Sequence, residues 1–184
     1  MASGRFLDPL TLLRLAPAIT AAASVTFSGN QQWIVSILLR DEFLCRSSSS
    51  SSESEEERFR DPEAVRAWLD VFFGLARTKV TGLLGASILG AAGNVWFAGD
   101  DRGQKWWYGA GLVLAVGSLG MGRVMGRRAG EVVGKGNKNG DGKVVVMVEG
   151  VRRWLRVNAV RSLTVDLGAW VCFVVAAVKA LQPL

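Results

Sequence analysis

Apolar residues in this chain gather in four long blocks separated by polar or charged stretches. The blocks lie at about residues 10–28, 80–98, 106–124 and 157–181. About 20 apolar residues, rising about 1.5 Å each, span the hydrocarbon core of a bilayer, so each block is long enough for a membrane helix. The pattern predicts an all-α, four-helix transmembrane bundle, in which residues 1–184 form a single membrane domain of a multi-pass integral membrane protein.

Two other segments have the spacing of amphipathic helices. Apolar residues around Trp33 recur at helical spacing within residues 29–46, and those around Trp68 do so within residues 64–75. Such helices lie at the membrane interface with their apolar side toward the acyl chains. We therefore expect two interfacial helices, the second leading into the span at 80–98. Between them, residues 47–58 are serine and glutamate followed by Arg58, with nothing apolar to bury, which predicts a disordered insertion.

The middle spans combine small residues with aromatic ends. Gly90 and Gly111 belong to a series of glycines that would let another helix approach closely within lipid. Such spans would also allow the chain to associate with other helices, including copies of itself. Asn94 ends the second span and residues 106–108 begin the third with Trp-Trp-Tyr, a pattern typical of anchors at the headgroup level.

The formal charge of +6 is unevenly distributed, because basic residues concentrate in the loop expected at 126–150. We expect residues 143–148 of this loop to be extended. Beside membrane spans, a basic loop indicates the cytoplasm and anionic lipid rather than nucleic acid. The distribution of Lys and Arg places both long loops in the cytoplasm and both termini on the far side. If the first block does not cross, three crossings remain and the N-terminus is cytoplasmic.

The last block contains three polar residues, Asn158, Arg161 and Asp166, at membrane depth. A charge there costs about 2.5–3.5 kcal/mol on insertion scales, and such residues usually face the bundle interior and mark functional sites. In a regular helical projection Asn158 and Arg161 share a face with Trp154, while Asp166 lies about 120° from Trp154. The chain has no histidine, which excludes Ser-His-Asp triads and most zinc, haem and iron sites, and its two cysteines lack metal-ligand spacing.

Residues 154–161, with the pattern W-x-x-x-N-x-x-R before a terminal span, resemble the closing motif of the fungal anthrone-oxygenase-like membrane proteins, a family of unknown-function domains. The layout of most of the chain is similar to that family, but the residue-level likeness covers only this motif. The resemblance implies a monooxygenase of secondary metabolism that oxidises a polycyclic polyketide anthrone to a quinone with O2, without metal, flavin or other cofactor.

That chemistry assigns roles to the polar residues. Removing a proton from an anthrone requires a base, and the enolate that forms requires hydrogen-bond donors and an apolar, aromatic pocket. Asp166 is the candidate base, and Arg161 and Asn158 are the candidate oxyanion donors. Trp154 and Trp68 are the candidate walls for substrate rings.

A non-catalytic interpretation of the same residues also stays open. Asn158 and Arg161 could cap the helix and reach toward lipid phosphates, while Asp166 pairs with a basic residue of the first span such as Arg14. The chain would then be a non-enzymatic structural or assembly protein that binds other helices through its glycine-rich spans.

Overall fold

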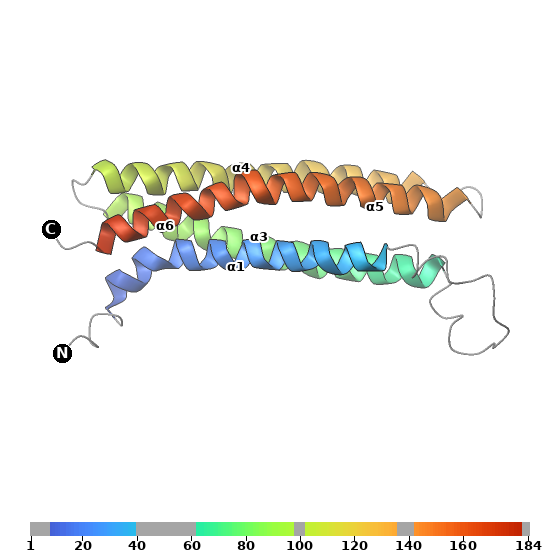
Figure 1. Ribbon diagram of the computed structural model, residues 1–184, viewed down its shortest axis with the longest axis horizontal. Coiled ribbons are helices and arrows are strands. Elements are labelled where there is room, and N and C mark those ends of the chain that lie inside the picture. The colour runs from blue at the N-terminus through green and yellow to red at the C-terminus, as the bar shows by residue number, and fades with distance from the viewer. Residues whose placement is uncertain (1–7, 40–61, 98–101, 136–141, 182–184) are drawn as a thin grey trace.

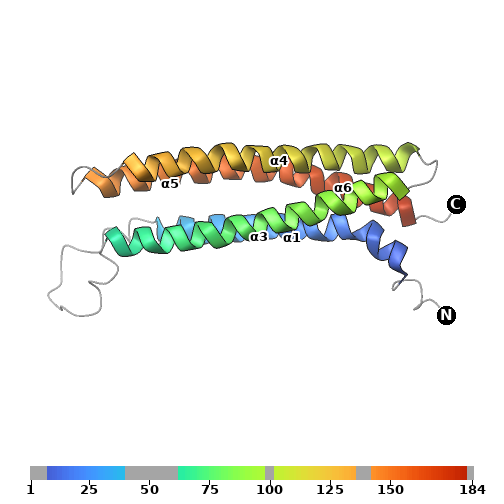
Figure 2. The same ribbon diagram turned by 180° about the vertical axis from the view of Figure 1, so that it is seen from behind.

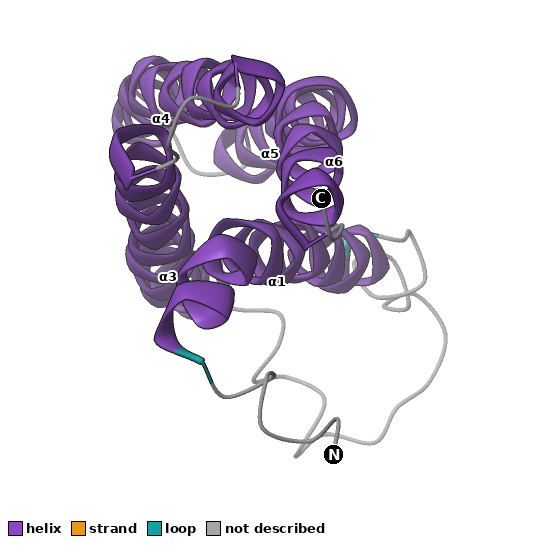
Figure 3. Cartoon of the chain, turned by 90° about the vertical axis from the view of Figure 1, so that its left-hand side faces the viewer, coloured by secondary structure: helices purple, strands orange, loops and turns teal. Residues whose placement is uncertain are grey.

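The computed structural model describes residues 8–39, 62–97, 102–135 and 142–181, and these are almost entirely helical. The elements in chain order are α1 (Pro9–Leu38), α3 (Pro62–Phe97), α4 (Arg102–Lys135), α5 (Gly142–Arg161), the π-helical turn η3 (Ser162–Asp166) and α6 (Leu167–Leu181). The last three form one continuous rod, so the chain folds into four rods side by side (Figures 1 and 2). Viewed end on, the rods enclose a common interior (Figure 3). The predicted all-α four-helix bundle is confirmed.

The rods alternate in direction, and this fixes which connections share an end of the bundle. Leu38, Pro62, Lys135 and Gly142 lie at one end, hereafter the connection end, and both chain termini emerge at the other, hereafter the terminal end (Figure 1). The two long connections therefore leave from the same end, as expected from the charges. That this end is cytoplasmic stays a prediction.

Three rods are long and apolar enough to cross a bilayer: Pro9–Ile37, Ala67–Phe97 and Glu149–Leu181. The protein is therefore a multi-pass integral membrane protein, as predicted. The glycine-rich α4 is not among these three, yet it joins the terminal end of α3 to the connection end of α5. Since both of its neighbours traverse the bilayer, α4 has to run across the same thickness.

The helices extend beyond the expected spans. Residues 29–38 continue α1 and residues 64–75 continue α3, so neither segment forms a separate helix at the interface. Residues 126–135 belong to α4, and residues 143–148, which we expected to be extended, belong to α5. The β-branched run at 144–146 favours a strand, but no strand lies among the described residues to pair with it. The insertion at 47–58 lies outside the described residues.

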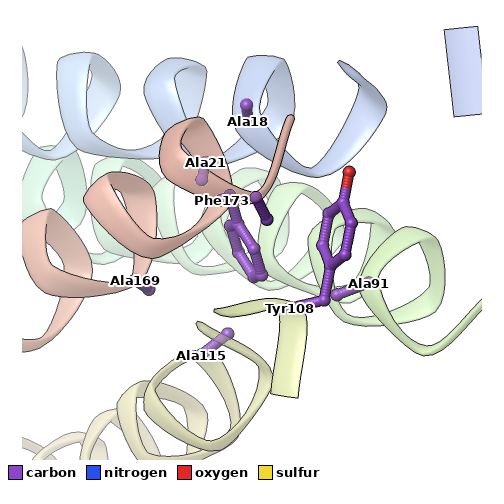
Figure 4. Packing of buried hydrophobic residues seen from close by; sticks show 8 residues of the cluster. Ala18, Ala21, Ala91, Tyr108, Ala115, Ala169 and Phe173 are labelled. Carbon is purple, nitrogen blue, oxygen red and sulfur yellow. The ribbon is translucent and has the colours of Figure 1, made fainter. Parts of the chain in front are cut away.

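The apolar core fills the terminal half of the bundle. It contains Ala18, Ala21, Ala91, Tyr108, Ala115, Ala169, Phe173 and Ala176. Figure 4 shows the rings of Phe173 and Tyr108 between small alanines of the surrounding helices. A Cβ at Gly111 would overlap the Phe173 ring, and one at Gly90 would lie 3.1 Å from Cγ of Pro17. Glycine at these two positions is what lets the helices approach, as the sequence predicted.

Two contacts between helices lie near Pro17, inside α1. Proline has no N–H to donate, so the Leu13 carbonyl, four residues before Pro17, loses its regular helical partner. The neighbouring Arg14 carbonyl also accepts a bond from another helix. Asn94 Nδ2 donates to the Leu13 carbonyl at 2.7 Å, and the Tyr108 hydroxyl donates to the Arg14 carbonyl at 2.8 Å. Asn94 and Tyr108 are both buried, not anchored at the headgroups as we expected. The prediction was wrong because these side chains donate to carbonyls of α1 near Pro17, one of which the proline leaves without a helical partner.

We predict that Asn94→Ala lowers the free energy of unfolding by about 1–3 kcal/mol, the usual cost of a buried polar group left without a partner. In a Pro17→Ala background residue 17 regains an N–H that can donate to the Leu13 carbonyl, so Asn94→Ala should cost less. Denaturation in detergent micelles of the two single variants and the double variant measures both quantities. An equal loss in both backgrounds would contradict the link between Asn94 and Pro17.

Candidate functional site

Toward the connection end Val35, Ala76 and Val151 are still buried, but most of the buried side chains are polar. The polar side chains are Ser24, Ser28 and Gln31 of α1, Ser118 of α4, Asn158 and Arg161 of α5, and Ser162 and Asp166 of η3. Each is less than a tenth exposed. In a protein surrounded by lipid, such a concentration of inward-facing polar groups is costly unless it binds something.

Asp166 lies at the centre of this polar half. The Ser118 hydroxyl donates to its Oδ1 at 2.5 Å, and Arg161 Nη2 lies 3.4 Å from its Oδ2. The second distance makes an ion pair but no hydrogen bond, and Oδ2 has no hydrogen-bond donor within the described part of the chain. The Arg161 guanidinium also lies against α4, where a Cβ at Gly122 would be 3.4 Å from Nη1. A serine and a glycine one turn apart on α4 thus accommodate the ion pair.

The π-helical turn is what brings the two charges together. In a regular α-helix residues 161 and 166 would point about 140° apart. A π-turn bonds residue i to residue i+5, so residue i+5 lies above residue i, here Asp166 above Arg161. Such turns are frequently found at functional sites. Sequence projection placed Asp166 on the flank of the helix, whereas in the structure it faces inward with Arg161 and Asn158.

The extra residue also shifts the buried face of α6. A regular helical projection puts Gly168, Ala169 and Cys172 on the face of Asn158 and Arg161. Ala169 is buried, but Gly168 and Cys172 are only half-buried, and Phe173 faces the core. After η3, the residues of α6 that face the core lie one position later in the sequence than a straight helix would place them. Without the π-turn, a single straight helix could not present both Arg161 and Phe173 to the interior.

The aromatic candidates lie near the connection end. Trp154 is half-buried one turn before Asn158, and its ring meets Phe73 of α3 edge-on at 4.7 Å between centroids. Trp68 is 42% exposed and stacks on Phe72 at 4.9 Å. Because Phe72 and Phe73 are themselves in contact, the four rings form an aromatic cluster between α3 and α5. Trp154 therefore adjoins the polar interior, and Trp68 lies at the outer side of the cluster.

Arg14 does not pair with Asp166, contrary to one alternative from the sequence. Its Nη1 donates instead to the Ala180 carbonyl at 3.0 Å, where it helps hold α1 against α6 at the terminal end. The ion-pair partner of Asp166 is Arg161, which belongs to the same rod as Asp166. Among the described residues, no three His, Cys, Asp or Glu side chains gather as metal ligands do.

A groove of about 430 Å³ opens between α1 and α5. It is lined by Gly29, Gln32, Trp33, Ser36, Leu155, Arg156 and Ala159. Ala159 directly follows the buried Asn158, so the groove lies on the outer surface of these helices at the level of Asn158. An apolar molecule dissolved in the bilayer could approach the site along this side.

Comparison with known proteins identifies fungal relatives. The chain is 31% identical over 178 residues to the epoxidase pydX of Acremonium sp, a match that covers 94% of this chain and 96% of the relative. This chain belongs to the fungal epoxidase family. The probable epoxidase scpX of Mollisia scopiformis is 33% identical over 82 residues, and the epoxidase gkaX of Penicillium citrinum is 36% identical over 83 residues. Each of these two matches covers 45% of this chain and just under half of the relative. No family model and no solved structure matches.

In this epoxidase-family chain, sequence reasoning found the polar site residues of the last rod but not those of α1 and α4. It missed Ser118, a lone hydroxyl among the glycines and aliphatic residues of α4. It also missed Ser24, Ser28 and Gln31, whose spacing of four and three residues places them on one face of α1. That spacing was visible in the sequence, but serine in a span of small residues equally indicates helix packing.

We predict that deleting the exposed Thr164 from η3 is tolerated. The deletion turns the π-turn into regular α-helix, leaves Asp166 four residues after Arg161, and keeps the buried faces on both sides aligned. Deleting the exposed Val171 of α6 should instead rotate one part of the rod by about 100° and abolish folding. Gel filtration and thermal unfolding in detergent compare the two. If both deletions unfold the protein equally, η3 is not a one-residue insertion.

We also predict that Arg161→Leu lowers stability by about 3–5 kcal/mol, because it leaves the Asp166 carboxylate buried without its cation. Adding Asp166→Leu should recover part of that loss. Arg156→Leu, at an exposed position on the same helix, should change stability by less than about 0.5 kcal/mol. A chemical denaturation series of the four proteins gives these values. A similar loss from Arg161→Leu and Arg156→Leu would contradict a buried ion pair.

Proposed function

We propose that the chain is a membrane-embedded epoxidase that oxidises an apolar, ring-containing polyketide with O2 inside the bundle. The observation that carries the proposal is the buried Asp166 carboxylate, which keeps Oδ2 without a hydrogen-bond donor while Ser118 and Arg161 hold the group in place. A carboxylate in that state can accept a proton. The epoxidase names of the relatives support an oxygen-transfer reaction.

The donors around Asp166 suit the charge that proton removal creates. Arg161 Nε and the Ser162 hydroxyl have no partner within the described residues, and Asn158 is buried one turn away. Donors arranged in advance around a developing oxyanion stabilise it most strongly where water is excluded. Arg161 therefore serves both as the counter-ion of Asp166 and as a candidate donor to the substrate oxyanion.

A hydroquinone is the simplest substrate that balances this chemistry. Asp166 takes the proton of one hydroxyl, a ring carbon of the oxyanion bonds to O2, and the second hydroxyl loses its proton. The inner peroxide oxygen then closes onto the adjacent carbon as the outer oxygen leaves in water. One hydroquinone and one O2 give one epoxyquinone and one water. Both electrons that reduce the departing oxygen come from the substrate, so the reaction needs no other reductant.

Anthrone oxidation is the second candidate, favoured by the likeness of residues 154–161 to the anthrone-oxygenase-like proteins. One anthrone and one O2 give one anthraquinone and one water, with the same proton removal at the start. Both polar residues of that motif are buried: Arg161 pairs with Asp166, and Asn158 lies about two turns before Asp166. The two reactions thus share a base and oxyanion donors, and they differ in how the peroxide breaks down once O2 has added. In either case Trp154 and the aromatic cluster that includes Trp68 would guide the substrate rings toward the polar interior.

Membranes that carry the protein should convert menadiol, a naphthohydroquinone, to its epoxyquinone under isotopically labelled O2, with one labelled atom in the product. Asp166→Asn should slow this at least about 100-fold, the usual effect of losing a general base. Asp70→Asn, the same change at an exposed position of α3, should leave the rate unaltered. Mass spectrometry of the extracted product measures both.

Dithranol, a dihydroxyanthrone, is supplied in parallel. Labelled anthraquinone without epoxide, lost in Asp166→Asn, would favour the second candidate. Equal product from wild type and Asp166→Asn would remove Asp166 from the mechanism. Product from neither compound above the level of empty membranes would overturn both reactions for these substrates.

A further inference from the structure

A row of polar side chains on α1 faces the interior and takes no part in the reaction described above. Ser24, Ser28 and Gln31 are 1%, 0% and 5% exposed. They follow one another at intervals of four and three residues, so they lie on one face of the helix. This α1 row runs along the bundle axis through the polar half of the interior.

The α1 row has no hydrogen-bond partner among the described residues. This holds for the hydroxyls of Ser24 and Ser28 and for Nε2 of Gln31. Thr20, one turn earlier on the same helix, contacts Ser87 of α3 at 2.8 Å between hydroxyl oxygens. Buried polar groups in folded proteins nearly always have a partner, and lipid offers none. The α1 row therefore has the character of a binding surface rather than of a packing interface.

The register of the helices places the α1 row opposite the reactive groups. α1 and the α5–α6 rod are antiparallel, and Arg14 bonds to the Ala180 carbonyl near one end of their interface. Near the other end, Gln32 and Ala159 line the same groove. Counting inward from these two points brings Gln31 and Ser28 to the level of residues 160–166, and Ser24 one turn further, near residues 167–170. The unpartnered atoms on that side are Arg161 Nε, Ser162 Oγ and Asp166 Oδ2.

We propose that the α1 row determines which substrate the site accepts, by hydrogen bonding to oxygen atoms on the edge of the substrate opposite Asp166. Ser24 and Ser28 are four residues apart, a rise of about 6 Å. The ligand class is thus a flat apolar molecule with at least two hydroxyl or carbonyl oxygens, rather than a plain hydrocarbon olefin. The identity of the reaction rests on the proposed function, but recognition of oxygen by the α1 row does not.

Binding of danthron, a dihydroxyanthraquinone that needs no oxidation, tests this separately from catalysis. Purified protein in detergent is titrated with danthron, and affinity is measured by calorimetry. The double variant Ser24→Ala/Ser28→Ala should bind at least about tenfold more weakly. Thr26→Ala removes a hydroxyl of the same helix that is exposed and lies outside the groove, so it should bind as wild type does. Anthracene, which has the same three rings without oxygen, should bind wild type and the double variant equally.

Gln31→Met, which keeps the side-chain length and removes the amide, provides an independent variant should the double variant fail to fold. It should weaken danthron binding several-fold. Danthron affinity that is unchanged in a folded α1-row variant would overturn the proposal, as would an equal loss for danthron and anthracene. Asp166→Asn should retain danthron binding, so an inactive protein that still distinguishes danthron from anthracene would reject the reaction and keep the recognition surface.

Discussion

Lipid offers no hydrogen bonds, so every polar group inside this bundle must be satisfied by another part of the protein or by a bound molecule. The contacts near Pro17 follow from that constraint: the Leu13 carbonyl loses its helical partner and accepts from Asn94 instead, and the Arg14 carbonyl accepts from Tyr108. Asp166 meets it only in part, because Ser118 donates to Oδ1 while Oδ2 has the Arg161 charge nearby but no hydrogen-bond donor among the described residues. The α1 row does not find partners within the described protein. These unpartnered side chains therefore mark the place where a bound ligand would supply the missing hydrogen bonds.

The apolar half of the interior sets the geometry of the polar half. Phe173 packs against Gly111, and seven residues away on each of these antiparallel helices Asp166 meets Ser118. Seven residues make about two full turns, so the same faces of α4 and of the last rod are in contact at both levels. The close packing that glycine permits in the core thus fixes the position of the carboxylate about 10 Å away. Substitutions at the core would act on the site through this register.

The sequence was sufficient for the fold class and for a multi-pass membrane protein, because long apolar blocks allow few structures in a membrane. It was also sufficient for Asn158 and Arg161, which a regular helix places on one face. The inward position of Asp166 could not be derived, since the projection assumes about 3.6 residues per turn and no residue pattern marks the π-turn. Asn94 was interpreted as an anchor because it ends a span. Only the folded chain shows that it meets the carbonyl freed by Pro17.

The polar interior also answers a problem that any enzyme of lipid-soluble substrates faces. An entirely apolar pocket within the membrane would be filled by acyl chains, which surround the protein in great excess over any substrate. Acyl chains cannot accept hydrogen bonds from Arg161, Ser162 or the α1 row, so their entry would leave buried donors unsatisfied, at about 1–3 kcal/mol each. An oxygen-bearing substrate satisfies the same donors. The buried donors that destabilise the empty interior are therefore the same groups that would let it bind a substrate in preference to lipid acyl chains.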